Sequence, residues 1–151
     1  MWEVKTDRAG LHNSLHSYSW YQGENDGGFE GDQNGAGTSC ILPNCNTSAF
    51  VEAVNAAGRC NFNDWRIPTH QELQSIMHFG VASGPFVDRD YFPHTNTRIL
   101  PPLWYWTSQP SADGGTAEVT RNAWAIDFAN GNDNFLNKST PARIRLVRGG
   151  R

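Results

Sequence analysis

The sequence predicts a single α+β domain in which two helices and a small twisted antiparallel sheet are connected by long loops. Its 151 residues fit one domain with one hydrophobic core. Two segments in the first half carry apolar residues at helical spacing between capping residues, and short segments in the second half alternate as strands do. The order of strand, helix, helix and strands favours an antiparallel sheet over a βαβ repeat.

The N-terminal region predicts two short strands and a surface loop. The first part of the chain alternates weakly and ends in Tyr18-Ser19-Trp20-Tyr21, whose aromatic rings suit a half-buried pleated surface. Residues 23–37 contain mostly Gly, Asn, Asp and Gln, which indicates a loop on the surface. The loop is too short to link two domains, so we expect residues 1–151 to form one domain.

Two helices are predicted from the residues at their ends. The first spans roughly Ser48 to Ala57, follows the capping oxygens of Asn46-Thr47-Ser48, and stops at Gly58. The second begins at Pro68-Thr69-His70-Gln71-Glu72, whose T-x-x-E pattern is a capping box. Both helices carry an apolar stripe that predicts packing against the core.

The second half predicts an irregular excursion followed by strands. Residues 79–102 contain four prolines and no sustained period, which indicates irregular structure. We expect this excursion to pack over the core through three aromatic residues, Phe86, Tyr91 and Phe92. Three strands are then predicted, at Leu103–Ser108, Ala123–Phe128 and Arg143–Arg148. A Gly-Thr-rich loop and an Asn-Gly-Asn-Asp-Asn loop separate them.

The three cysteines indicate an oxidising compartment and one disulfide. Their spacings, at Cys40, Cys45 and Cys60, match no common zinc pattern. The predicted helix after Cys45 is about 15 Å long at 1.5 Å per residue, so Cys45 and Cys60 lie farther apart than the ~5.5 Å that a disulfide needs. Residues 40–46 can run back along the helix, which favours a Cys40–Cys60 disulfide. The other pairings, and the absence of a disulfide, stay open.

Composition and charge argue against nucleic acid and membrane partners. Charged residues make up 18% of the chain, the formal net charge is −3, and Lys and Arg are scattered apart from one C-terminal group. A basic surface that follows phosphates is therefore not expected. No stretch approaches the roughly 18 apolar residues of a membrane span, so no membrane insertion is expected.

Five ordered motifs resemble those of one bacterial domain family. The segment Asp64-Trp65-Arg66-Ile67-Pro68-Thr69, followed by Glu72-Leu73, is similar to the D-W-R-[LI]-P-T-x-x-E-L signature of the Lcl C-terminal domain family, which includes the C-terminal domain of the Legionella collagen-like adhesin. Four further segments of the chain resemble other motifs of this family, namely Met1–Lys5, Tyr105–Ser108, Trp124–Gly131 and Arg145–Gly150. The resemblance therefore covers essentially the whole chain.

The resemblance implies a fold related to C-type lectins and to the sulfatase-activating enzymes, with the first and last strands paired. It also implies a location outside the cell or on its surface, as part of a longer secreted or lipid-anchored precursor. Some domains of this broad fold are adhesins or diversified receptors, so the family does not fix the ligand. The sulfatase activators use a cysteine pair near their C-terminus, and no cysteine follows Cys60 here, which argues against that activity.

The residues themselves predict binding rather than catalysis. The five histidines form no H-E-x-x-H pattern, and the paired glycines belong to no nucleotide-binding or nucleophile motif. We therefore expect no enzyme activity and no cofactor. The D-W-R-I-P-T signature is interpreted as a folding element, in which Trp65 fills the core, Arg66 pairs with a carboxylate or with carbonyls, and Thr69 caps the helix.

A late polar stretch is the candidate ligand site. Amide and carboxylate groups there offer donors and acceptors for sugar hydroxyls, or oxygens for Ca²⁺, which stays a secondary possibility because the usual calcium-lectin tripeptides are absent. The residues concerned are Asp127, Asn130, Asn132, Asp133, Asn134 and Asn137. An ordinary Asn-Gly turn between two strands is the structural alternative.

Neighbouring side chains complete the predicted site. Trp104 and Tyr105 offer faces for stacking on sugar rings, although alternation directs Tyr105 away from Trp104 and Trp106, so at least one of these faces is core. Arg143 belongs to the C-terminal basic group, which either attracts an anionic partner or keeps an edge strand from aggregating.

The resulting hypothesis is an extracellular adhesion domain that binds a glycan or a host surface. The alternative is a protein–protein interaction module in a surface or phage-like assembly, with a diversified receptor and a trimer as possible forms. Exposed aromatic residues arranged in a groove would favour a glycan, and a flat apolar patch would favour a protein.

Overall fold

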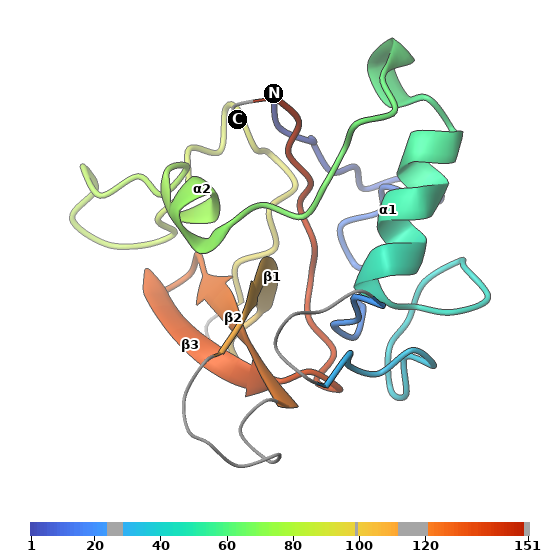
Figure 1. Cartoon of the computed structure of the whole chain (residues 1–151). Helices are drawn as coiled ribbons and strands as arrows, with labels where there is room; N and C mark the ends of the chain where they lie inside the picture. Colours follow the sequence, from blue (N-terminus) through green and yellow to red (C-terminus); the bar gives the residue numbers. More distant parts are fainter. Residues whose placement is uncertain (24–28, 99, 112–120, 150–151) are drawn as a thin grey trace.

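A computed structural model describes residues 1–23, 29–98, 100–111 and 121–149. Within these ranges the elements are α1 (Thr47–Ala56), a 3₁₀ turn (Arg59–Asn61), α2 (His70–Gln74), β1 (Trp104–Pro110), β2 (Asn122–Asp127) and β3 (Asn132–Asn137). The strands form one antiparallel sheet in the order β1-β2-β3. Figure 1 shows α2 beside the sheet and α1 on the other side of the molecule. The predicted α+β class is confirmed.

Local capping chemistry sets the starts of both helices, as predicted. The side chain of Asn46 accepts a hydrogen bond from the amide of Ala49 at 2.8 Å, so α1 begins at Thr47. At α2 the capping box is complete, because Thr69 accepts from the amide of Glu72 and Glu72 accepts from the amide of Thr69. These bonds satisfy amides that a helix N-terminus leaves without an intrahelical partner.

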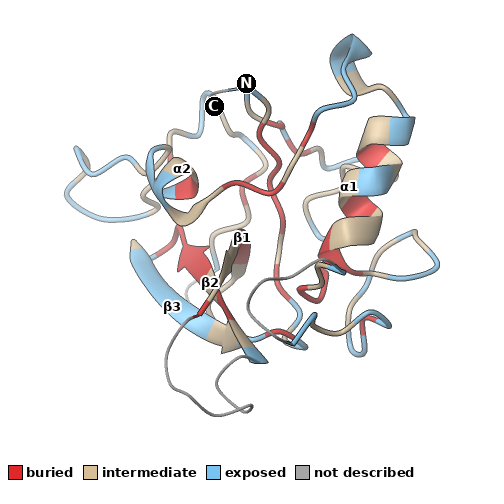
Figure 2. Ribbon diagram, in the orientation of Figure 1, coloured by how far each residue is buried: buried red, intermediate tan, exposed pale blue. Residues whose placement is uncertain are grey.

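The centre of the sheet is buried on both faces. On one face Trp106 lies opposite Ala125 and belongs to a hydrophobic cluster with Phe50 of α1. On the other face Tyr105 lies opposite Ile126 and belongs to a second cluster that α2 and the 79–102 excursion cover. The expectation that Tyr105 points away from Trp106 is therefore confirmed. Figure 2 shows the buried residues concentrated along β2 and the adjoining extended segments.

The stretch predicted as a polar loop forms β3 instead. A turn at Asn130-Gly131 reverses the chain, with Gly131 at a φ of 75°, a conformation that costs glycine little. All six β3 residues then pair with β2. Leu136 packs on the face of the α1 cluster, and Phe135 contacts Trp124 on the opposite face. Pairing and packing of these two apolar residues outweigh the low strand propensity of Asn and Asp.

The last segment is extended but is not a continuous strand. Arg143 bridges to Tyr105 in parallel, while Val147 bridges to both Trp2 and Arg66. The expected pairing of the first and last segments is confirmed, because the amide of Glu3 donates to the carbonyl of Leu146 at 2.9 Å. The amide of Arg148 likewise donates to the carbonyl of Met1 at 2.9 Å, and Figure 1 shows the first residues beside the last described segment.

The predicted Cys40–Cys60 disulfide is wrong. Cys40 pairs with Cys45, with their Cα atoms 5.7 Å apart, and Cys60 is exposed with a free thiol. The cap at Asn46 fixes the start of α1, and the bend at residues 41–44, which precede the helix, brings Cys40 back to Cys45. Cys60 lies past the other end of α1, in the 3₁₀ turn, and so is out of reach of Cys40.

The 79–102 excursion covers the core only in part. Phe92 packs on the second hydrophobic cluster and faces the guanidinium of Arg145 at 4.6 Å, and Phe86 is half-buried. The expectation for Tyr91 is wrong, since its side chain is 74% exposed. Alternating spacing cannot be read in irregular structure, so the direction of each aromatic ring there depends on the path of the backbone.

The D-W-R-I-P-T signature is a folding element, as interpreted from the sequence. Trp65 is buried, and its backbone exchanges two hydrogen bonds with the side chain of Asn55 on α1. Arg66 donates to both carboxylate oxygens of Glu72 at 2.6 and 2.7 Å, which ties the signature to the capping box. This pairing holds the pKa of Glu72 at about 2, since the hydrogen bonds from Arg66 favour the charged carboxylate.

Candidate functional site

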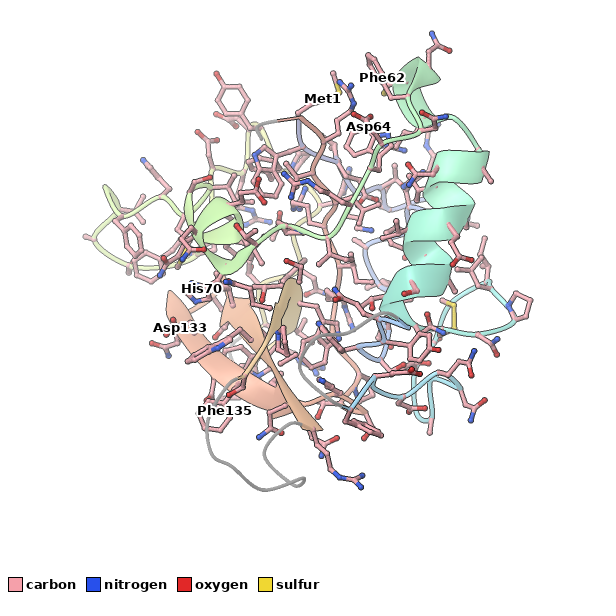
Figure 3. All side chains as sticks on the ribbon, viewed as in Figure 1. Met1, Phe62, Asp64, His70, Asp133 and Phe135 are labelled. Atoms are coloured by element: carbon pink, nitrogen blue, oxygen red, sulfur yellow. A yellow bond between two sulfur atoms is a disulfide. The ribbon has the colours of Figure 1, made fainter. Side chains whose placement is uncertain are left out.

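A groove of about 340 Å³ opens between the start of α2 and the sheet. The residues that line this α2–sheet groove are His70, Gln71, Gln109, Pro110, Trp124 and Asp133. They come from α2 and from all three strands, so the groove exists only once the sheet has formed beside the helix. Figure 3 shows His70 above Asp133, with Phe135 farther along the same strand.

Backbone geometry places each of these side chains. His70 is the first residue of α2, and its amide donates to the side-chain oxygen of Gln109 on β1 at 2.9 Å. Asp133 lies opposite Ile126 and Phe135 lies opposite Trp124 in the β2–β3 register. Residues two apart on a strand share a face, so Trp124, Asp133 and Phe135 all project to the side of the sheet that α2 covers.

The groove combines an aromatic surface with polar groups. Nε2 of His70 lies 2.8 Å from Oδ2 of Asp133, and because a carboxylate oxygen only accepts, Nε2 is the donor. The ring of Trp124 meets those of His70 and Phe135 edge-on, with centroids 5.6 and 5.7 Å apart. The side chain of Asp133 is 45% exposed and Phe135 is 41% exposed, so both are accessible to a ligand.

The structure brings one of the predicted polar residues into this groove, namely Asp133. Its neighbours Asn132 and Asn134 alternate to the opposite face of β3 and are exposed there. Asn130 lies in the turn, where its side-chain amide donates to Asp127, and Asn137 is the last residue of β3, where its side chain accepts from the amide of Ser139. The predicted residues are thus divided between the two faces of the sheet and the turn before β3.

The other predicted residues are engaged within the fold. Tyr105 is 1% exposed, and its hydroxyl accepts from the amide of Asn96 at 2.9 Å. Asp127 is also 1% exposed and accepts from the amide of Ala129. Trp104 packs against the first hydrophobic cluster. Arg143 is half-buried, and burial lowers the pKa of its guanidinium. A ligand-binding role for these residues stays a prediction.

Sequence reasoning missed five lining residues, His70, Gln71, Gln109, Pro110 and Trp124, and their neighbour Phe135. The five histidines form no metal or catalytic motif, so nothing in the local sequence singles out His70. One signal was available: an Asn-Gly turn at 130–131 predicts a hairpin, and alternation in a hairpin places Asp133 and Phe135 on the face of Trp124. The contribution of α2 had no local signal, because it depends on tertiary packing.

Within the described ranges no group of three or more His, Cys, Asp or Glu side chains gathers as a metal-binding cluster would. In the same part of the chain no helix has the length and apolar character to cross a bilayer.

Comparison with known proteins identifies one family. The family described as the Lcl C-terminal domain matches the chain over residues 1–148. No curated protein and no solved structure gives a significant match. The expected likeness to C-type lectins therefore stays a prediction.

Proposed function

The chain belongs to the Lcl C-terminal domain family, and on this basis we propose that it is a non-catalytic adhesion domain that binds a glycan in the α2–sheet groove. The single observation that carries the proposal is the composition of that groove, where the ring of Trp124 lies beside the paired His70 and Asp133. Aromatic faces stack on the apolar C–H surface of a sugar ring, while carboxylate and amide groups bind its hydroxyls.

An extracellular or surface location is part of this proposal. The Cys40–Cys45 disulfide supports it, since disulfides persist mainly in oxidising compartments. The proposed context is a longer secreted or lipid-anchored protein that presents this domain to a host surface or another cell.

Binding without catalysis is supported by the carboxylate content of the groove. Asp133 is the carboxylate among the described lining residues, and it is already paired with His70. Glycoside hydrolysis ordinarily needs two carboxyl groups on opposite sides of the scissile bond. Incubation of the protein with each glycan that it binds, followed by mass spectrometry, should return the glycan intact.

The groove is tested by three variants on one strand. Asp133→Asn removes the charge with little change in shape and is expected to weaken glycan binding by about ten- to a hundredfold, as the loss of a hydrogen bond to a charged group implies. Asn132→Ala and Asn134→Ala alter the adjacent residues on the opposite face and should leave binding within twofold. A glycan array screened with all four proteins makes the comparison.

The outcomes separate the hypotheses. If Asn132→Ala and Asn134→Ala lose binding while Asp133→Asn keeps it, the ligand does not bind in the α2–sheet groove. The opposite face of β3 would then be the favoured binding site. A blank array with folded protein would favour the alternative, a protein–protein interaction module. The exposed side chains of Phe79 and Tyr91 on the 79–102 excursion are the feature that supports this alternative, since apolar surface of this kind is common where proteins bind one another.

A further inference from the structure

A second cavity lies on the other side of β1 from the α2–sheet groove. It measures about 250 Å³ and is formed between the start of α1, the segment before α2 and the end of β1. Its lining includes Tyr21, Val51, Glu52, Ile67 and Ser108. This α1–sheet cavity has no part in the function proposed above.

A narrow ridge separates the two cavities. Ser108 lines the α1–sheet cavity, and the next residue, Gln109, lines the α2–sheet groove. Consecutive Cα atoms are about 3.8 Å apart and successive side chains of a strand point to opposite faces, so the backbone at Ser108 and Gln109 is what separates the two cavities. The amide of Ser108 donates to the carbonyl of Pro68 at 2.8 Å, which holds the 67–70 strip along β1. Figure 1 shows this strip passing between α1 and α2, and it contributes Ile67 to one cavity and His70 to the other.

The two cavities share the same chemistry. Each offers one half-buried aromatic ring, Tyr21 in one and Trp124 in the other, and each has one partly or fully exposed carboxylate, Glu52 or Asp133. Glutamine amides lie in both, with Gln22 lining the α1–sheet cavity. Among the described residues that line them, neither cavity has a lysine or an arginine. Carboxylates in cavities whose described lining has no lysine or arginine disfavour sulfated or carboxylated sugars.

We propose that the two cavities are adjacent subsites for a single uncharged oligosaccharide, which crosses the ridge formed by Pro68 and Ser108. The proposal rests on glycan binding in the α2–sheet groove and adds a second subsite, a minimum ligand length and a preference for neutral sugars. Occupation of the second subsite adds contacts without a second cost of association, so affinity rises once the ligand is long enough to reach it.

Calorimetric titration with defined oligosaccharides tests the proposal. The probes are cello-, malto-, chito- and mannooligosaccharides, each from the monosaccharide to the hexasaccharide, with a heparin-derived hexasaccharide as the sulfated comparator. For at least one neutral series, affinity is expected to rise about tenfold or more between the monosaccharide and the tetrasaccharide and then level off. The sulfated comparator should bind at least tenfold more weakly than the best neutral hexasaccharide.

Two variants assign the subsites. Glu52→Ala, at an exposed position of α1, is expected to remove the gain with length and to leave affinity for the shortest bound ligand within twofold. Asp133→Asn should weaken ligands of every length, and Asn132→Ala should change neither. Circular dichroism confirms that each variant is folded.

The results distinguish this inference from the proposed function. If Asp133→Asn weakens binding but Glu52→Ala leaves the length dependence intact, the groove stands and the second subsite is refuted. Stronger binding of the sulfated hexasaccharide refutes the preference for neutral sugars. Failure of all four neutral series to bind contradicts both proposals.

Discussion

Replacing Glu3 with Gln is expected to lower the free energy of unfolding by about 3–5 kcal/mol, the usual cost of breaking a buried ion pair. The side chain of Glu3 is fully buried and lies 2.9 Å from Nζ of Lys5 and 2.7 Å from Nδ1 of His12. It also accepts from the amide of Leu146, which joins the first segment of the chain to the last. The variant leaves the ammonium of Lys5 buried without its counter-ion.

The same group predicts sensitivity to acid. Burial raises the pKa of Glu3, but Lys5, His12 and the amide of Leu146 together outweigh it and bring the pKa from 4.5 to about 2. A folded-state pKa below the unfolded one stabilises the protein above pH 4.5, and this contribution is lost as the pH falls from 4.5 towards 2.

Urea unfolding at pH 7 and at pH 3 measures both effects. The difference between wild type and Glu3→Gln should be large at pH 7 and smaller at pH 3, and the exposed carboxylate variant Glu52→Gln should lie within about 0.5 kcal/mol of wild type. Equal stability of Glu3→Gln and wild type at pH 7 would mean that the buried pair contributes nothing. If the variant does not fold, the acid dependence of the wild type still tests the role of the carboxylate.

Trp106→Ala is expected to cost about 3–5 kcal/mol, as large-to-small substitutions in a core do. The Trp106 side chain is fully buried, packs over Ala125 of β2, and donates from Nε1 to the carbonyl of Tyr18 at 2.8 Å. Its removal leaves a cavity against the first hydrophobic cluster and a buried carbonyl without its donor.

Chemical denaturation of Trp106→Ala beside Phe79→Ala provides the comparison. Phe79 is an aromatic residue with 66% of its surface exposed, so its truncation should change the free energy of unfolding by no more than about 0.5 kcal/mol. Similar losses for the two variants would contradict the placement of Trp106 at the centre of the core.

Predictions that rested on local chemistry were the accurate ones. The caps at Asn46 and Thr69 were identified from residues within one helical turn, because the bonds involved join atoms only a few residues apart. The strands β1 and β2 were recognised by alternation, and the resemblance correctly paired the two ends of the chain. For the caps and the strands the information lies in the pattern of neighbouring residues, whereas the pairing of the ends came from the resemblance to the family.

Predictions that needed long-range geometry were less accurate. The disulfide depended on the path of residues 40–46 relative to α1, which spacing does not specify, and the true partner of Cys40 is the nearer Cys45. Strand β3 was not predicted because Asn and Asp are poor strand formers in isolation. The strand forms because it pairs with β2.

The candidate site was predictable in part for the same reason. Asp133 was identified from the chemistry of its stretch. That it points to the face opposite to Asn132 and Asn134 follows from the hairpin register. His70 joins the groove because Gln109 binds the start of α2, a contact between residues 39 positions apart. Such a contact leaves no local trace in the sequence.

The most direct test of glycan recognition in the α2–sheet groove is a titration of the indole N–H signals in two-dimensional ¹H–¹⁵N NMR spectra, with the tightest-binding oligosaccharide of the neutral series. The signal of Trp124 is predicted to shift progressively with ligand, together with the amides of His70 and Gln71. The indole signals of Trp20 and Trp106, which donate to buried carbonyls, should stay in place. Shifts that avoid Trp124 and gather at Asn132 and Asn134, or along the 79–102 excursion, would contradict the account.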